Sequence, residues 1–294
     1  MTASNPPRPL DESLYEMKQD EEELLSSLTG IKDAGELKQH VLAVQSEIYK
    51  IHPYYYRYSE RDRYRRLKMC RYPAYAELLK LGRERPGALF LDLGCCVGQD
   101  LRKAVADGFP ISQMLASDLH PEFWDTGHKL FKSTPETFPV PFIQADIFDP
   151  ASLAPLPVPS APPSEPPAPR APPKTLTPLA GSLAAIHASY FFHLFAEEQQ
   201  AHAARLLAPL LSPAPGSMIF GGHVGRPERG LHGSQNTHGI PMFCHSPDSW
   251  RALWAGVFPE GRVRVDAHLE EFTRADHDVG DFKGYLLVWC VTRV

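Results

Sequence analysis

The stretch LFLDLGCCVGQDLR, residues 89–102, is the part of the sequence that decides the fold. A short apolar run of strand type leads to Asp92, and glycines follow at Gly94 and Gly98 before helical periodicity resumes at Leu101. Gly94 permits a sharp turn, and Gly98 permits close approach of a ligand to the backbone. Free N–H groups at a helix start favour anionic or polar ligand atoms. The pattern therefore predicts a strand, a ligand-binding loop and a helix N-terminus.

Two further acids follow apolar runs of the same kind. The run 111–116 leads to Asp118, about twenty residues past the glycines, where a carboxylate can accept hydrogen bonds from both ribose hydroxyls. The run 140–144 leads to Asp146, with Ile147 beside it. The sequence gives little support to a nicotinamide dinucleotide as the ligand, because the glycines are spaced G-x-x-x-G and the G-x-G-x-x-G pattern is missing. The three acids at the ends of successive predicted strands are stronger evidence for a ligand site than the glycine loop alone.

The remaining sequence continues the alternation of strands and helices. Apolar runs predict strands over 182–189, 216–222, 262–269 and 285–292, and helices over 121–132, 196–211 and from Pro247, with Ser246 as a candidate N-cap. The Gly- and His-rich residues 221–239 are predicted to form a long loop. Strands and helices in alternation imply a parallel sheet covered by helices. We expect an α/β fold with a Rossmann-like, seven-stranded, mostly parallel sheet, closed by an antiparallel pair of strands.

An N-terminal helical cap is expected to precede this sheet. Helical periodicity runs over 12–28 and 33–50, with Asp33 as N-cap, and shorter helices are expected over 59–69 and 73–81. The tyrosine-rich run 51–58 either packs the cap onto the core or roofs a ligand pocket. The predicted domains are therefore an N-terminal extension, residues 1–85, and a ligand-binding domain, residues 86–294.

The composition changes abruptly over residues 151–178, where proline, alanine and serine dominate. This composition predicts an extended, disordered loop without packed structure. Because the strand and helix alternation resumes after it, the segment is expected to be a loop inside one domain. A tolerated surface loop is favoured over a binding site for a proline-recognising partner.

Charge and composition argue against several classes of function. The chain has 294 residues, a formal net charge of -5 and no basic block, so nucleic-acid binding is not expected. No apolar run is long enough to span a membrane and residues 1–20 are polar, so a cytoplasmic protein is expected. The 5 cysteines show no C-x-x-C spacing, and no metal site is predicted. The sequence gives no indication of the oligomeric state.

The glycine loop and the acids at three strand ends resemble a class I S-adenosylmethionine-dependent methyltransferase. The resemblance implies S-adenosyl-L-methionine as the cofactor. Its implied contacts are Asp92, Gly94 and Gly98 on the methionine and ribose side, Asp118 at the ribose hydroxyls, Asp146 and Ile147 beside the adenine, and Cys95, Leu119 and Ala188 as further contacts. Arg57 or Arg71 is a candidate partner for the carboxylate of the cofactor.

A narrower resemblance rests on three segments: LDLGCCVGQDLRK (91–103), IHASYFFHLF (186–195) and CHSPDSW (244–250). They resemble the fungal methyltransferases of secondary-metabolite clusters, most closely those that esterify carboxylic acids in meroterpenoid pathways. The similarity covers the chain from about residue 50 to its end. Two features depart from the family pattern: the long Pro-rich insertion, and Ala184-Ala185 where an acid commonly precedes the fourth strand.

The resemblance implies an enzyme that methylates an oxygen of a small natural product, either a carboxylate or a phenol. Methyl transfer from a sulfonium is an in-line displacement, so the protein mainly aligns the acceptor and excludes water. A carboxylate needs only orienting groups, whereas a phenol needs a base with a pKa near neutrality, usually a histidine. The candidate catalytic residues are His193 and His245, with His223 as a weaker candidate.

Alternatives remain open at this point. A methyltransferase fold without transferase activity, whether regulatory or a cyclase that uses the bound cofactor only for electrostatics, would carry the same cofactor residues. A nucleic-acid methyltransferase is disfavoured, because the chain has no Asn/Asp-Pro-Pro-Tyr motif for a flipped base and no basic stripe.

Overall fold

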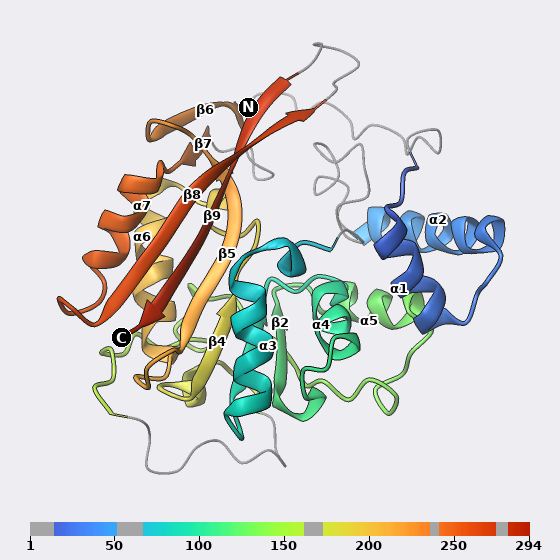
Figure 1. Ribbon diagram of the computed structural model, residues 1–294, viewed down its shortest axis with the longest axis horizontal. Coiled ribbons are helices and arrows are strands. Elements are labelled where there is room, and N and C mark those ends of the chain that lie inside the picture. Colours follow the sequence, from blue (N-terminus) through green and yellow to red (C-terminus); the bar gives the residue numbers. More distant parts are fainter. Residues whose placement is uncertain (1–14, 52–66, 162–172, 236–240, 275–281) are drawn as a thin grey trace.

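The computed structural model describes residues 15–51, 67–161, 173–235, 241–274 and 282–294 (Figure 1). A seven-stranded sheet has the order β3-β2-β1-β4-β5-β9-β8. Its strands are β1 (Leu89–Leu93), β2 (Met114–Asp118), β3 (Phe142–Gln144), β4 (Leu183–His187), β5 (Met218–Gly225), β8 (Val263–Arg274) and β9 (Phe282–Arg293). The strands β3-β2-β1-β4-β5 pair in parallel, whereas β9 is antiparallel to β5 and β8. The predicted Rossmann-like α/β fold is confirmed.

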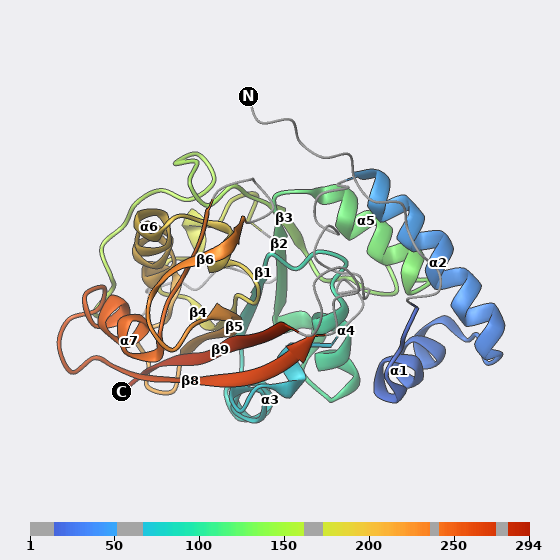
Figure 2. The same cartoon turned by 90° about the horizontal axis from the view of Figure 1, so that it is seen from above.

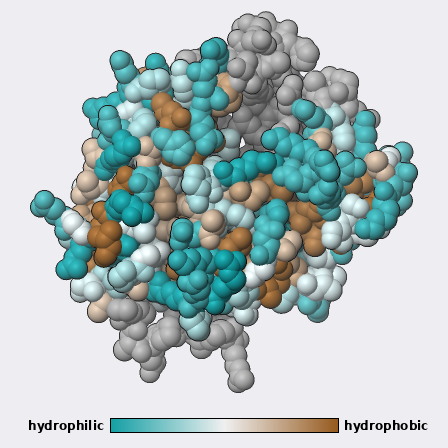
Figure 3. All heavy atoms as spheres, in the orientation of Figure 1, coloured by the Kyte–Doolittle hydropathy of each residue, from teal (hydrophilic) through white to brown (hydrophobic). Residues whose placement is uncertain are grey.

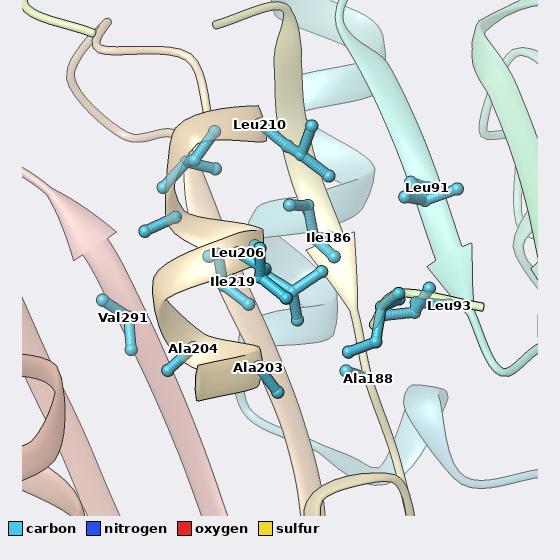
Figure 4. Packing of buried hydrophobic residues seen from close by; sticks show 14 of the residues in the cluster. Leu91, Leu93, Ile186, Ala188, Ala203, Ala204, Leu206, Leu210, Ile219 and Val291 are labelled. Carbon is cyan, nitrogen blue, oxygen red and sulfur yellow. The ribbon is translucent and has the colours of Figure 1, made fainter. Parts of the chain in front are cut away.

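Helices cover both faces of the sheet. The α-helices are α1 (Gln19–Thr29), α2 (Ala34–Ile51), α3 (Ala74–Glu84), α4 (Gln99–Ala106), α5 (Pro121–Leu130), α6 (Glu197–Leu207) and α7 (Pro247–Ala255). On one face, residues of α6 and α7 pack against Leu91, Ile186 and Ile219 of the central strands. Figure 4 shows residues of α6 beside Ile186 and Ile219. On the other face, residues of α3, α4 and α5 pack against Phe90 and Phe220. Because successive side chains of a strand point to opposite faces, each apolar strand supplies both cores.

The N-terminal helices pack on α5, at the edge of the molecule (Figure 2). The stripe Leu37, Val41, Val44 and Ile48 of α2 is buried there. Both predicted helix boundaries in this region are confirmed, since Gly30 ends α1 with a left-handed φ of 75° and the carboxylate of Asp33 accepts the backbone N–H of Glu36 at 2.8 Å. By contrast, α3 covers the sheet itself and belongs structurally to the main layers. The tyrosine-rich run 52–58 lies outside the described residues.

The Pro-rich segment is packed at both of its described ends, which corrects the expectation of an unpacked loop over 151–178. Leu153 and Leu176 are 1% and 0% exposed, and the backbone N–H of Leu176 donates to the carbonyl of Ser152. Ala154 N–H donates to Thr177 Oγ1 at 2.9 Å. Within the described residues between β3 and β4 there is no α-helix, so these leucines fill the core where a covering helix would otherwise pack. The composition of the segment did not predict these buried leucines, because they are few and lie among many prolines.

A small second sheet was not predicted from the sequence. Within the stretch predicted as a long loop, β5 continues to Gly225, and β6 (Gly230–Gln235) pairs antiparallel with β7 (Pro241–Cys244). The glycines in this stretch mask the alternation that would predict strands. The Ser246 N-cap is confirmed, because its Oγ accepts the backbone N–H of Ser249 at 3.2 Å. On the face shown in Figure 3, apolar residues form small groups between polar ones.

Candidate active site

The loop after β1 is fastened to the end of β2. The backbone N–H groups of Gly94 and Cys95 both donate to the carbonyl of Ser117, at 2.8 and 3.1 Å. Gly94 (φ 70°) and Cys96 (φ 52°) both have positive φ, which is costly for the cysteine. Gly94 is exposed, and an added Cβ there would meet only Phe191, at 3.4 Å. The backbone at Gly94 is therefore open to a ligand.

Asp118 holds this loop from the end of β2. Its Oδ2 accepts the backbone N–H of Cys96 at 2.9 Å, and its Oδ1 accepts that of His120 at 3.0 Å. Burial raises the pKa of Asp118, and the two backbone hydrogen bonds oppose this rise. Each carboxylate oxygen keeps a lone pair, so the group can accept two more hydrogen bonds. Leu119, beside it, is 48% exposed, which leaves an apolar surface next to the acid.

Gly98 serves the packing of the loop. It is buried, and a Cβ at this position would lie 2.6 Å from Trp124 and 2.8 Å from Arg102. The packing of α4 and α5 and the positive φ of 70° both require glycine at this position. The implied contact of its backbone with the cofactor stays a prediction.

Arg102 is a buried support of the same loop that the sequence did not reveal. Its guanidinium donates to the carbonyls of Val97 (2.9 Å) and Gly98 (3.3 Å) and to Ser133 Oγ (3.1 Å). It also lies over the ring of Phe138, at 4.2 Å. Burial lowers the pKa of Arg102 to about 9, which still leaves it charged at neutral pH.

Replacing Arg102 with methionine is expected to lower the free energy of unfolding by about 2 kcal/mol, because the loop carbonyls lose a charged donor inside the protein. Urea denaturation followed by circular dichroism measures the change. Lys103→Met is the matched control, since Lys103 is on the same helix and forms an i,i+4 ion pair with Asp107. Its cost should stay within about 0.5 kcal/mol. Equal costs for the two variants would contradict the assigned role.

Asp92 starts a hydrogen-bonded chain across the ends of the central strands. Its Oδ1 lies 2.7 Å from His187 Nδ1, and His187 Nε2 lies 2.7 Å from Ser189 Oγ. Ser189 Oγ in turn lies 3.1 Å from the hydroxyl of Tyr72 and accepts the backbone N–H of Gly222 at 3.3 Å. Burial is the main reason why the pKa of Tyr72 is raised well above its ordinary value.

Only Asp92 of this chain was singled out from the sequence. Asp92 and His187 are register partners on the parallel strands β1 and β4, although 95 residues separate them. Aligning the ends of the predicted strands would have been the one available signal. Tyr190, which follows Ser189, has a φ of 53°, so the chain turns sharply directly after this network.

The two candidate arginines are placed differently with respect to the described residues. Arg71 forms an ion pair with Asp20 of α1 at 2.9 Å and is exposed. Arg57 lies outside the described residues, and the contact of either arginine with the cofactor stays a prediction. Lys68 is a further cation in this region, with its Nζ 5.4 Å from the ring centroid of Tyr190. Asp100, at the start of α4, accepts the backbone N–H of Lys68 at 3.0 Å and so positions this segment.

The third acid and its neighbours lie at the end of β3 and β4. Asp146 is exposed, and its Oδ1 accepts the backbone N–H of Phe148 at 2.9 Å. Ile147 is buried at 4% exposure. The backbone N–H of Ala188, directly after β4, donates to the carbonyl of Phe220 at 2.9 Å. The cofactor contacts implied for these residues stay predictions.

The three candidate histidines lie together. The rings of His193, in the 3-10 turn η6 (Phe192–Leu194), and His223, on β5, are stacked with centroids 6.5 Å apart. His245 follows β7, and its ring and that of His223 both contact Trp250, at 5.3 and 4.7 Å. Burial is the first cause that lowers the pKa of both, to about 4 for His245 and well below the ordinary value for His223. Neither ring is charged at neutral pH.

The described residues bear on metal binding, on membrane spanning and on the fit of the cofactor. Among them, no group of three His, Cys, Asp or Glu side chains could hold a metal ion. No helix among them is long and apolar enough to cross a membrane. For S-adenosylmethionine the donor set is suitable, because the exposed Gly94 lies in the loop held by the carboxylate of Asp118 and Leu119 supplies an apolar surface beside that acid.

Comparisons with known proteins give the family. Residues 10–56 match the model of the meroterpenoid methyltransferase N-terminal domain. The O-methyltransferase phiE of Fungal sp. is 31% identical over 205 residues, 70% of this chain and 60% of phiE. The methyltransferase adrK of Penicillium rubens is 31% identical over 68% of this chain and 63% of its own. The aligned part thus spans less than two thirds of these two relatives.

One solved structure is similar to this chain at lower identity. The S-adenosylmethionine-dependent methyltransferase of Mesorhizobium loti is 16% identical, with a TM-score of 0.44, over 76% of this chain and 100% of the other.

A further relative is aligned along most of its length. The asnovolin E/chermesin D methyltransferase nvfJ of Aspergillus novofumigatus is 30% identical over 263 residues, 88% of this chain and 83% of nvfJ. On this similarity, together with the matching N-terminal domain, the protein belongs to the fungal meroterpenoid methyltransferase family.

Proposed function

We propose that this protein is an S-adenosylmethionine-dependent methyltransferase that methylates an oxygen of a small natural product. The observation that carries the proposal is the carboxylate of Asp118, held by two backbone N–H groups at the end of β2 beside the exposed Leu119. The relatives support the transferase activity, since their names include O-methyltransferase and methyltransferase. A cytoplasmic location and the absence of nucleic-acid partners stay predictions from composition.

The chain's own residues have separate tasks in this proposal. The free lone pairs of Asp118 accept the ribose hydroxyls, and Leu119 and Ile147 flank the adenine. The loop at Gly94 and Cys95 and the end of β4 at Ala188 hold the methionine part. When bound, S-adenosylmethionine supplies an activated methyl group on a sulfonium. The protein then has to exclude water and hold the acceptor oxygen in line.

The methyl acceptor is a carboxylate or a phenol of the substrate, which binds near the ends of β4, β5 and β7. His193 and His245 are the proposed contacts, and both come from segments that meet around Trp250 and His223. A carboxylate arrives ionised and needs only hydrogen bonds that orient it. A phenol needs a general base with a pKa near neutrality. His245 is poorly suited to this task, because its pKa is lowered to about 4.

Asp118→Ala is expected to weaken S-adenosylmethionine binding by at least about tenfold, because the ribose hydroxyls lose a charged acceptor. Isothermal titration calorimetry with S-adenosylmethionine and S-adenosylhomocysteine measures the change. Since Asp118 also holds Cys96, Asp118→Asn is the informative companion: it keeps one carbonyl acceptor and should lose less affinity. Asp149→Ala is the control, at an exposed acid after the third strand. Absence of binding to the unaltered protein would refute the proposed function.

A further inference from the structure

Two buried histidine nitrogens have no hydrogen-bond partner among the described residues. They are Nε2 of His223 and Nε2 of His245, and the two residues are 0% and 3% exposed. Unpaired polar atoms in a protein interior are rare and costly. Two of them on rings that share one neighbour, Trp250, indicate a common cause.

The tautomer of His223 is fixed by its other nitrogen. Trp289 Nε1, which can only donate, lies 3.0 Å from His223 Nδ1. His223 Nδ1 therefore accepts, and the proton of the neutral ring is on Nε2. This N–H is a donor without an acceptor. His245 Nδ1 lies 2.9 Å from Ser249 Oγ, so Nε2 is the nitrogen left for another partner. The hydroxyl of Ser249 can donate or accept; where it donates to Nδ1, the proton of the neutral His245 ring is on Nε2.

The position of His223 is close to the predicted acceptor side of the site. β5 extends beyond the end of β4, and the backbone N–H of Tyr190 donates to the carbonyl of Gly222, one residue before His223. The rings around the two histidines are aromatic: Phe192 lies 5.9 Å from His223, and Phe243 lies 5.1 Å from His245. Such walls suit a planar or apolar ligand with a polar oxygen.

We propose that Nε2–H of His223, together with Nε2–H of His245 in the tautomer whose Nδ1 accepts from Ser249 Oγ, binds a carboxylate or carbonyl oxygen of the methyl acceptor and orients it. This inference rests on the proposed function and assigns an acceptor subsite to it. The bound oxygen satisfies the buried donor. It reaches the histidines when the side chains of η6, Phe192 and His193, move aside, because both pack over His223.

The role of His223 is limited to donation. The one lone pair of its neutral ring is engaged by Trp289, so His223 has no free lone pair with which to remove a proton from a phenol. His223 is therefore a binding residue for an oxygen that only accepts hydrogen bonds.

Substitutions can separate the two nitrogens of His223. His223→Asn keeps an acceptor near the Nδ1 position for Trp289 and removes the donor, whereas His223→Gln can place an amide N–H near the Nε2 position. Binding of benzoate and of acetophenone, two probes with aromatic bodies, is measured by ligand-observed NMR titration. We expect His223→Asn to weaken binding of the favoured probe about tenfold and His223→Gln to recover most of the loss. His245→Asn should also weaken it.

The controls distinguish failure of this subsite from failure of the proposed function. His268→Asn, at an exposed histidine of β8, should bind the probes as the unaltered protein does. S-adenosylhomocysteine titration of every variant reports cofactor binding separately, and thermal unfolding reports folding. Preference for benzoate identifies a carboxylate oxygen and preference for acetophenone a carbonyl. Unchanged binding in His223→Asn and His245→Asn, or no binding of either probe to the unaltered protein, overturns the proposal.

Discussion

Asp92→Ala is expected to lower the free energy of unfolding by about 3–5 kcal/mol, the largest effect of a single substitution that we predict. Asp92 and His187 are 3% and 2% exposed, and the atoms Oδ1 and Nδ1 lie 2.7 Å apart. Removal of the carboxylate leaves His187 Nδ1–H without an acceptor in a site that water does not reach. Chemical denaturation at neutral pH measures the loss.

A double-mutant cycle tests whether the pair is the cause. His187→Leu alone leaves a buried carboxylate unpaired, whereas the double variant Asp92→Ala with His187→Leu leaves neither group. The double variant should therefore be more stable than the sum of the two single losses predicts, by at least about 1 kcal/mol. Asp146→Ala is the matched control at an exposed strand-end acid, with a cost within about 0.5 kcal/mol. Additive losses would show that the two side chains do not depend on each other.

The same pair shows what sequence reasoning can and cannot reach. The strand, glycine loop and acid around Asp92 were predictable because they are set by neighbours in the chain. The helix caps Asp33 and Ser246 were predictable for the same reason. The partner of Asp92 was not, because His187 becomes its neighbour only through the register of β1 on β4.

Packing accounts for the other failures. Gly98 was predicted from a loop pattern, and the pattern could not indicate that the missing side chain also makes room for Trp124, which comes from a helix after the next strand. Leu153 and Leu176 lie in a Pro-rich segment, but both are buried in the same cluster as residues of the central strands and of α6. In each case the deciding contact joins segments that no local pattern connects.

The candidate histidines were found one at a time, each from its place after a predicted strand or in a family-like segment. The structure adds that η6, β5 and β7 bring them together. It also adds the partners Trp289 and Ser249, which occupy one nitrogen of His223 and one of His245. These partners decide the chemistry of the rings, and no spacing in the sequence indicates them.

Acidification from pH 6.5 to pH 4 is expected to lower the free energy of unfolding by about 3 kcal/mol through His245 alone. Burial lowers the pKa of His245 from 6.5 to about 4 in the folded protein. Below pH 6.5 the unfolded chain therefore binds a proton that the folded protein does not, and stability falls with pH. The contribution is fully present above pH 6.5 and is lost as the pH approaches 4. His223 adds to the loss in the same direction, because its pKa is also lowered.

Urea denaturation of the unaltered protein and of His245→Asn, at pH 7, 6, 5 and 4.5, isolates this contribution from that of the carboxylates. Asparagine does not titrate and keeps an acceptor for Ser249, so the variant should lose less stability on acidification, and the two curves should converge toward low pH. His202→Asn, at an exposed histidine of α6, should follow the unaltered protein. Parallel curves for His245→Asn and the unaltered protein would mean that His245 takes up its proton as readily in the fold as in the unfolded chain. The assignment of His245 as a buried histidine that stays neutral would then be wrong, whereas the donor of His223, which is set by Trp289, would not be affected.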